Sequence, residues 1–95
     1  MRINKAKLAA ARRASMAADL AAAFIASGES YRCTAAVTYN PALVEKAREL
    51  ARLAIAEGLS FGNSQSNTSP RHVADLALSD AARIVSAHYF PKVQA

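Results

Sequence analysis

The sequence predicts a mainly α-helical protein: one compact domain of three to four helices over residues 1–95. Its length of 95 residues fits a single domain. About a quarter of the residues are alanine, the strongest helix former, and apolar residues recur at helical spacing between glycine and proline stops. Because an alanine side chain buries little apolar area, we expect a thin core despite a hydrophobic content of 53%.

The first segment predicts a basic N-terminal helix over about residues 4–27. Met16, Leu20 and Phe24 recur at the four-residue spacing that places them on one helical face. Gly28 follows where a left-handed C-cap is expected. These residues therefore predict a helix that turns one apolar stripe towards the core.

The clearest helical pattern covers about residues 41–57. Asn40 is the expected N-cap, Pro41 suits the first helical position, and Gly58 ends the pattern. One face is apolar: Leu43, Val44, Ala47, Leu50, Ala51, Ala54 and Ile55. The opposite face is charged and predicts two ion pairs at three-residue spacing, Glu45 with Arg48 and Glu49 with Arg52.

The third helix is expected over about residues 70–89, after a polar loop at 58–69. Ser69 is the expected N-cap and Pro70 the first helical residue. The predicted buried stripe is Val73, Leu76, Ala77, Ala81, Ile84 and Val85, and it continues to His88. We favour an unbroken helix; the alternative is a kink at Ser79 and Asp80, which have the residue types of a fresh N-cap.

Residues 31–39 admit two interpretations. Apolar and polar residues alternate from Tyr31 to Tyr39, which is typical of a half-buried strand. The favoured interpretation is instead a short helix or extended connection that packs Tyr31 and Ala35 on the core, because the chain offers a strand no strong partner. The two differ in consequence, since an exposed strand edge could pair with another protein.

The sequence lacks the residue patterns of an enzyme, a metal site or a cofactor site. The single cysteine, Cys33, excludes an internal disulfide, indicates a reducing compartment such as the cytoplasm, and is expected to be a buried thiol. His72 and His88 are too far apart on one helix to share a metal. Ser69, His72 and Asp75 share a helical face, but the N-cap position accounts for Ser69. We therefore expect a non-catalytic protein.

Positive charge gathers at the N-terminus. The formal net charge is +5, and five basic residues in the first thirteen positions are candidates for binding phosphates or an acidic surface: Arg2, Lys5, Lys7, Arg12 and Arg13. The plainer interpretation is a solvated helix end that keeps an alanine-rich domain in solution. No uninterrupted apolar run reaches the length of a membrane span, so a membrane partner is not expected.

Two hypotheses about function follow. The first is a small helical protein that binds a protein partner, as an inhibitor, an adaptor, or a subunit of an assembly that includes homo-oligomers; such proteins are common on phages and other mobile elements. Its candidate contact residues are tyrosines and loop amides, namely Tyr31, Tyr39, Asn63, Gln65 and Asn67. The alternative is a nucleic-acid-binding regulatory protein that places its basic N-terminal helix on phosphates.

Overall fold

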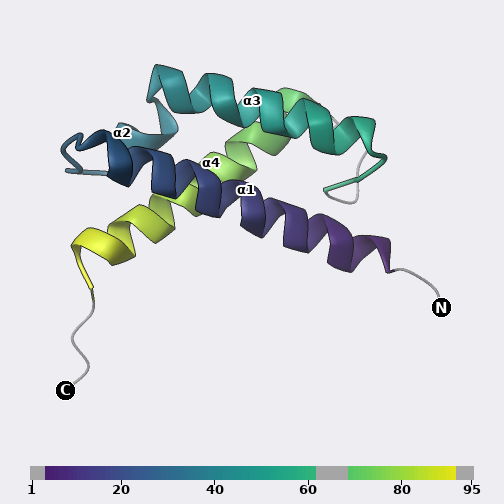
Figure 1. The fold of residues 1–95 in the computed structure, drawn as a ribbon, viewed down its shortest axis with the longest axis horizontal. Coiled ribbons are helices and arrows are strands. Elements are labelled where there is room, and N and C mark those ends of the chain that lie inside the picture. Colours follow the sequence, from purple (N-terminus) through teal and green to yellow (C-terminus); the bar gives the residue numbers. More distant parts are fainter. Residues whose placement is uncertain (1–3, 62–68, 92–95) are drawn as a thin grey trace.

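The computed structural model describes residues 4–61 and 69–91, and this part of the chain is an all-α domain (Figure 1). Its four helices are α1 (Lys5–Ser27), α2 (Ala35–Thr38), α3 (Pro41–Ala56) and α4 (Pro70–Tyr89). The three long helices occupy the ranges expected from the sequence. The prediction of a compact three- to four-helix domain is confirmed.

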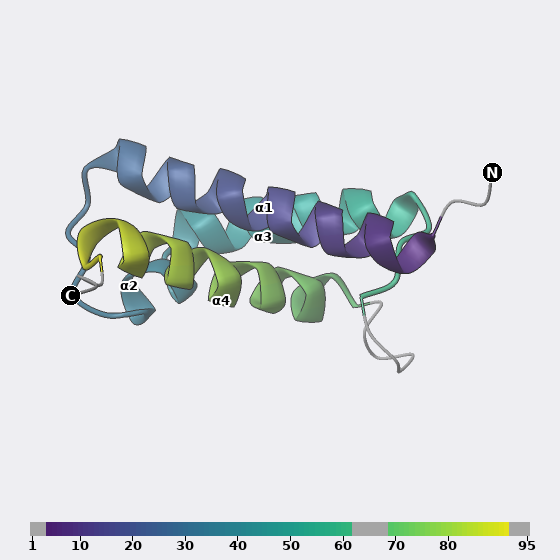
Figure 2. The ribbon, with the colours of Figure 1, turned by 90° about the horizontal axis from the view of Figure 1, so that it is seen from below.

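The helices form two layers. Helices α1 and α3 run side by side in opposite directions, and α4 crosses behind both of them (Figure 1). Turned by 90°, the molecule shows α4 and the short α2 on one side of the α1–α3 layer (Figure 2). Helix α4 contacts all three other helices, and the α1–α4 and α3–α4 contacts are more extensive than those between α1 and α3.

Both ends of α1 are capped by local chemistry. The Asn4 side-chain oxygen accepts hydrogen bonds from the amides of Ala6, at 3.0 Å, and Lys7, at 3.3 Å. These bonds satisfy two of the amides that a helix leaves unpaired at its start. At the other end Gly28 adopts the left-handed conformation, with φ of 75°, as the sequence predicts.

Helix α3 also begins and ends as predicted. The Asn40 side-chain oxygen accepts a hydrogen bond from the Leu43 amide at 3.2 Å, and Pro41 occupies the first turn. At the C-terminal end Gly58 has φ of 89°. The Leu59 amide then donates to the Ala54 carbonyl at 3.2 Å, which closes the helix in a Schellman-type turn.

Helix α4 is unbroken, so the kink considered at Ser79 and Asp80 does not occur. Ser69 has the extended backbone of an N-cap, but its side chain makes no capping hydrogen bond. Two residues of the predicted buried stripe, Ile84 and His88, are exposed instead. Ile84 is 42% exposed, whereas Leu78 is 1% exposed and was absent from the predicted stripe. Helix α4 is covered by both α1 and α3. Its buried face is therefore wider than the predicted stripe and includes Ala74, Leu78 and Ala82 beside it.

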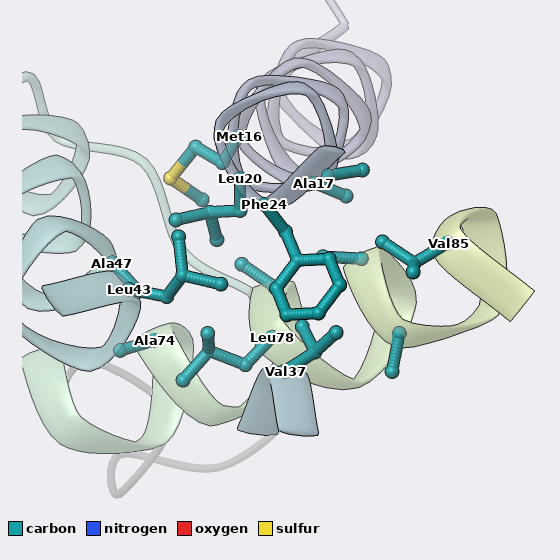
Figure 3. Packing of buried hydrophobic residues seen from close by; sticks show 14 of the residues in the cluster. Met16, Ala17, Leu20, Phe24, Val37, Leu43, Ala47, Ala74, Leu78 and Val85 are labelled. Atoms are coloured by element: carbon teal, nitrogen blue, oxygen red, sulfur yellow. The ribbon is translucent and has the colours of Figure 1, made fainter. Parts of the chain in front are cut away.

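The core is thin, as expected from the alanine content. More than half of the buried hydrophobic residues among those described are alanines. Figure 3 shows the Phe24 ring extending from α1 towards Val37 of α2 and towards Leu78 on α4. On α3, Ala47 and Ala51 are fully buried. Since alanine keeps the space between helices small, the few large side chains fill the space where all four helices meet.

The strand considered for residues 31–39 is wrong. Residues Ala35–Thr38 form α2, and amides there donate to carbonyls three or four residues back, as from Thr38 to Thr34 at 3.0 Å. These local bonds satisfy the backbone without a partner strand. The expectation of a buried Cys33 is also wrong: its side chain is exposed in the turn before α2, and Val37, at 0% exposure, enters the core instead.

Candidate functional site

Tyr39 is the most exposed large apolar side chain among the described residues, at 80%. Its backbone is nevertheless held on both sides. The Tyr39 amide donates to the Ala35 carbonyl at 3.0 Å, and the next amide, of Asn40, donates to the Val37 carbonyl at 3.3 Å. Because Val37 is buried and Asn40 caps α3, the tyrosine projects from a fixed point between two helices.

Beside Tyr39 lies a groove of about 370 Å³ between the end of α2 and helices α3 and α4. We call it the Tyr39 groove. The residues that define it are Tyr39, Val44 and Arg48 on one side and Arg71, Asp75 and Leu78 on the other. Four-residue spacing puts Val44 and Arg48 on one face of α3, and similar spacing places the α4 residues on the facing side.

The Tyr39 groove carries two guanidinium groups and one carboxylate. Neither Arg48 nor Arg71 forms an ion pair with any residue that the structure describes. The pair predicted between Glu45 and Arg48 is therefore not formed, nor is that between Glu49 and Arg52. These long side chains lie on solvated surface, where an ion pair gains little over hydration.

Arg12 binds a carboxylate of the same chain. Its guanidinium donates two hydrogen bonds to Glu57, and the bond from Nη2 to Oε1 is 3.0 Å long. This bidentate contact raises the pKa of Arg12 and lowers the pKa of Glu57, in each case chiefly through the side-chain hydrogen bond. It joins the first half of α1 to the end of α3.

Arg13 is engaged in the same way on the other side of α1. Its guanidinium donates to both carboxylate oxygens of Asp80 on α4, with Nη2 to Oδ1 at 3.0 Å. The hydrogen bond raises the pKa of Arg13. Asp80 also lies 3.7 Å from Arg83. Two of the five candidate phosphate-binding residues are thus paired within the protein.

Tyr31 belongs to an aromatic cluster at the end of the molecule where α1 and α4 finish. Its ring meets Phe24 edge to face, with centroids 6.2 Å apart, and stacks on Tyr89 at 6.1 Å. Phe90 lies at 6.0 Å in a tilted arrangement. Tyr31 is partly buried against the core, so it helps to hold the connection after α1, unlike Tyr39.

The remaining candidate residues are not brought together. Lys5 and Lys7 are exposed in the first turn of α1. Other candidates lie outside the described residues: Arg2, Asn63, Gln65 and Asn67. Among the tyrosine and amide candidates that the structure describes, Tyr39 borders a groove. Among the basic candidates, Arg12 lines a separate depression beside Glu57.

Ser69, His72 and Asp75 line one shallow depression at the start of α4. The structure shows no hydrogen bond among these three side chains, so no proton path links a nucleophile to a base. Within the described ranges, no three histidine, cysteine or acidic residues are grouped as metal ligands.

A second groove, of about 610 Å³, runs along the last turns of α4 and contains Phe90, which is 62% exposed. Its one charged lining residue is Arg83, which lies near Asp80. The Phe90 groove is therefore apolar and has no unpaired charge to select an occupant. It differs in this respect from the Tyr39 groove.

Sequence reasoning missed Arg48 and Arg71 as site residues. Arg48 was assigned to the charged face of α3, and Arg71 had no signal beyond its place in the first turn of α4. Arg48 and Arg71 are 23 positions apart in the sequence, so no local pattern links them. Only the crossing of the two helices brings them to one groove.

In the described residues, the fold and the Tyr39 groove define an all-α, two-layer protein with a surface site that combines charged and aromatic side chains. No protein-family model, no curated protein and no solved structure matches the chain. None of the helices in residues 4–61 and 69–91 combines the length and apolar character needed to cross a membrane.

Proposed function

We propose that this chain is a non-catalytic helical protein that acts by binding another protein, as an inhibitor, an adaptor or an assembly subunit. The observation that carries this proposal is Tyr39, which is 80% exposed on a backbone fixed by α2 and the α3 cap. A tyrosine offers a large contact area at a low entropic cost. A fixed backbone lowers that cost further, because little ordering remains to be done on binding.

We place this function in the cytoplasm, since a single exposed thiol at Cys33 suits a reducing compartment. We also propose that a phage or another mobile element encodes the chain, because small helical binding proteins are common there. Self-association through the Tyr39 groove is a form of the protein-binding proposal.

The nucleic-acid hypothesis has less support. It uses five N-terminal basic residues, but Arg12 and Arg13 already bind Glu57 and Asp80. Contact with phosphates through these arginines would have to break two bidentate ion pairs. Protein binding is therefore the function that the geometry favours.

The test is affinity capture from the cells that express the protein, followed by mass spectrometry, with wild type and Tyr39→Ala side by side. Leu53→Ala is the matched control, because Leu53 is 58% exposed on α3 and does not line the groove. We expect a partner, or a second copy of the chain, that wild type and Leu53→Ala retain and Tyr39→Ala loses. Identical capture by all three proteins would refute a binding role for Tyr39.

A further inference from the structure

We infer that the Tyr39 groove binds an acidic segment of a partner protein, with carboxylates placed between Arg48 and Arg71. The inference rests on the proposed function and names the chemistry of the partner. The two arginines come from different helices and line the same groove. An arginine fork matches a carboxylate with two parallel hydrogen bonds, so two such groups across one groove define an anion-selective surface.

The charge of the groove is not compensated within the described chain. Arg12 and Arg13 bind carboxylates, whereas Arg48 and Arg71 have none within ion-pair distance. Asp75 also lines the groove, on the same helix as Arg71 and four residues after it. One carboxylate against two guanidiniums leaves a net positive groove that complements an acidic ligand.

The apolar part of the groove favours a protein segment over a nucleic acid. Val44 is half-buried and Leu78 almost fully buried, and both line the groove. A peptide can place an apolar side chain there between two acidic residues. A nucleic-acid backbone carries a charge at every phosphate, and Asp75 would repel those phosphates that do not meet an arginine.

Tyr39 completes the site as an aromatic wall beside the charges. Its ring offers apolar contact and its hydroxyl can donate a hydrogen bond to a carboxylate. The expected ligand is therefore a short segment with acidic residues around a single apolar one. Tyr39 supplies contact area, and the arginines supply selectivity for negative charge.

The experiment selects ligands from a phage-displayed library of random twelve-residue peptides on the immobilised full chain. The groove variant is the double substitution Arg48→Glu/Arg71→Glu. The matched control is Arg32→Glu/Arg52→Glu, which makes the same change in net charge at exposed residues outside the groove. Circular dichroism verifies that each variant is folded.

We expect wild type and the control to enrich peptides with aspartate or glutamate around an apolar residue. Synthetic copies of those peptides should bind the groove variant at least about tenfold more weakly, because each contact turns from attraction to repulsion. A Tyr39→Ala variant should also bind them more weakly.

Four results would overturn the inference. The first is enrichment of peptides without acidic residues; if their binding still requires Tyr39, the proposed function stands and only the acidic partner is wrong. The second is equal binding of acidic peptides to the groove variant and to wild type. The third is displacement of the peptides by oligothymidylate that binds more tightly than they do, which would assign the groove to nucleic acid. If no peptide is enriched, the inference also fails, and the capture experiment above still decides whether Tyr39 binds a protein.

Discussion

At the scale of single residues, a few large side chains carry most of the hydrophobic stabilisation. Phe24, Leu20 and Met16 on α1 are each at most 2% exposed, and each removes far more apolar area from water than the surrounding alanines. Large apolar residues that remain exposed, such as Leu53 at 58%, contribute much less. The sequence cannot separate these two groups by residue type, because both contain leucines within helices.

Two leucines test this difference directly. Leu20→Ala should lower the free energy of unfolding by about 3 kcal/mol, because it empties a fully buried position. Leu53→Ala removes the same atoms from a side chain that is 58% exposed and should change stability by less than about 0.5 kcal/mol. Urea denaturation followed by circular dichroism measures both. Similar losses for the two variants would contradict the burial seen in α1 and α3.

At the scale of elements, the short helix α2 fixes the positions of the two tyrosines that flank it, Tyr31 and Tyr39. Val37 anchors α2 in the core. Asn40 joins α2 to α3, and its side-chain Nδ2 donates a hydrogen bond to Glu29 Oε2 at 3.0 Å. The connection from α1 is held separately by the Tyr31 cluster. Tyr31 and Tyr39 therefore flank one element but have different roles.

The two tyrosines should respond differently to truncation. Tyr31→Ala removes an edge-to-face contact with Phe24 and a stack on Tyr89, and should lower the free energy of unfolding by about 2 kcal/mol. Tyr39→Ala should leave it within about 0.5 kcal/mol, since its ring is largely in water. Thermal and urea denaturation distinguish these outcomes. A destabilised Tyr39→Ala would mean that Tyr39 supports the fold rather than a partner.

The contact between α1 and α3 predicts a pH dependence. Arg12 lowers the pKa of Glu57 in the folded state, so the ionised carboxylate stabilises the fold above its ordinary pKa of about 4.3, and that stabilisation is lost as pH falls through the lower folded value. Wild type should therefore exceed Glu57→Gln in stability at pH 7, and the difference should shrink below about pH 4.

The control for this pH dependence is Glu49→Gln. Glu49 is exposed on α3 and forms no ion pair with a described residue. Its substitution should give a stability difference that changes little across the same pH range. If the two variants followed the same pH curve, the Arg12 contact would not be formed in solution.

At the scale of the whole molecule, two layers of helices leave much surface uncovered. The shortest dimension is 21 Å, about two helix diameters. Each long helix is therefore buried on one side, and its charged residues lie on the other side, since no charged residue is buried in the described part of the chain. The positive charge near the N-terminus is partly neutralised within the molecule, because Arg12 binds Glu57 and Arg13 binds Asp80.

The ion pairs of Arg12 and Arg13 limit the number of basic residues that are free to bind DNA. If both ion pairs persist, at most three of the five N-terminal basic residues are left for phosphates, and the slope of log K against log salt on duplex DNA should be no steeper than about −3. Fluorescence anisotropy of a labelled duplex at several salt concentrations measures the slope. A value of about −4 to −5 would mean that about five phosphates are contacted, more than the free N-terminal residues can supply, and would favour the nucleic-acid hypothesis.

Sequence patterns and tertiary contacts determined different parts of this protein. Local chemistry in the sequence specified the three long helices, since Asn40 with Pro41 and the glycines at 28 and 58 act on their own neighbours. The alternation of apolar and polar residues at 31–39 fitted either a strand or a short helix. The helix is the one that forms, and in it Val37 is buried in a core built by the other helices. The Tyr39 groove was predictable only in part: the sequence indicated a tyrosine, but the crossing of α3 and α4 placed Arg48 and Arg71 beside it, because helix packing joins residues that no local spacing relates.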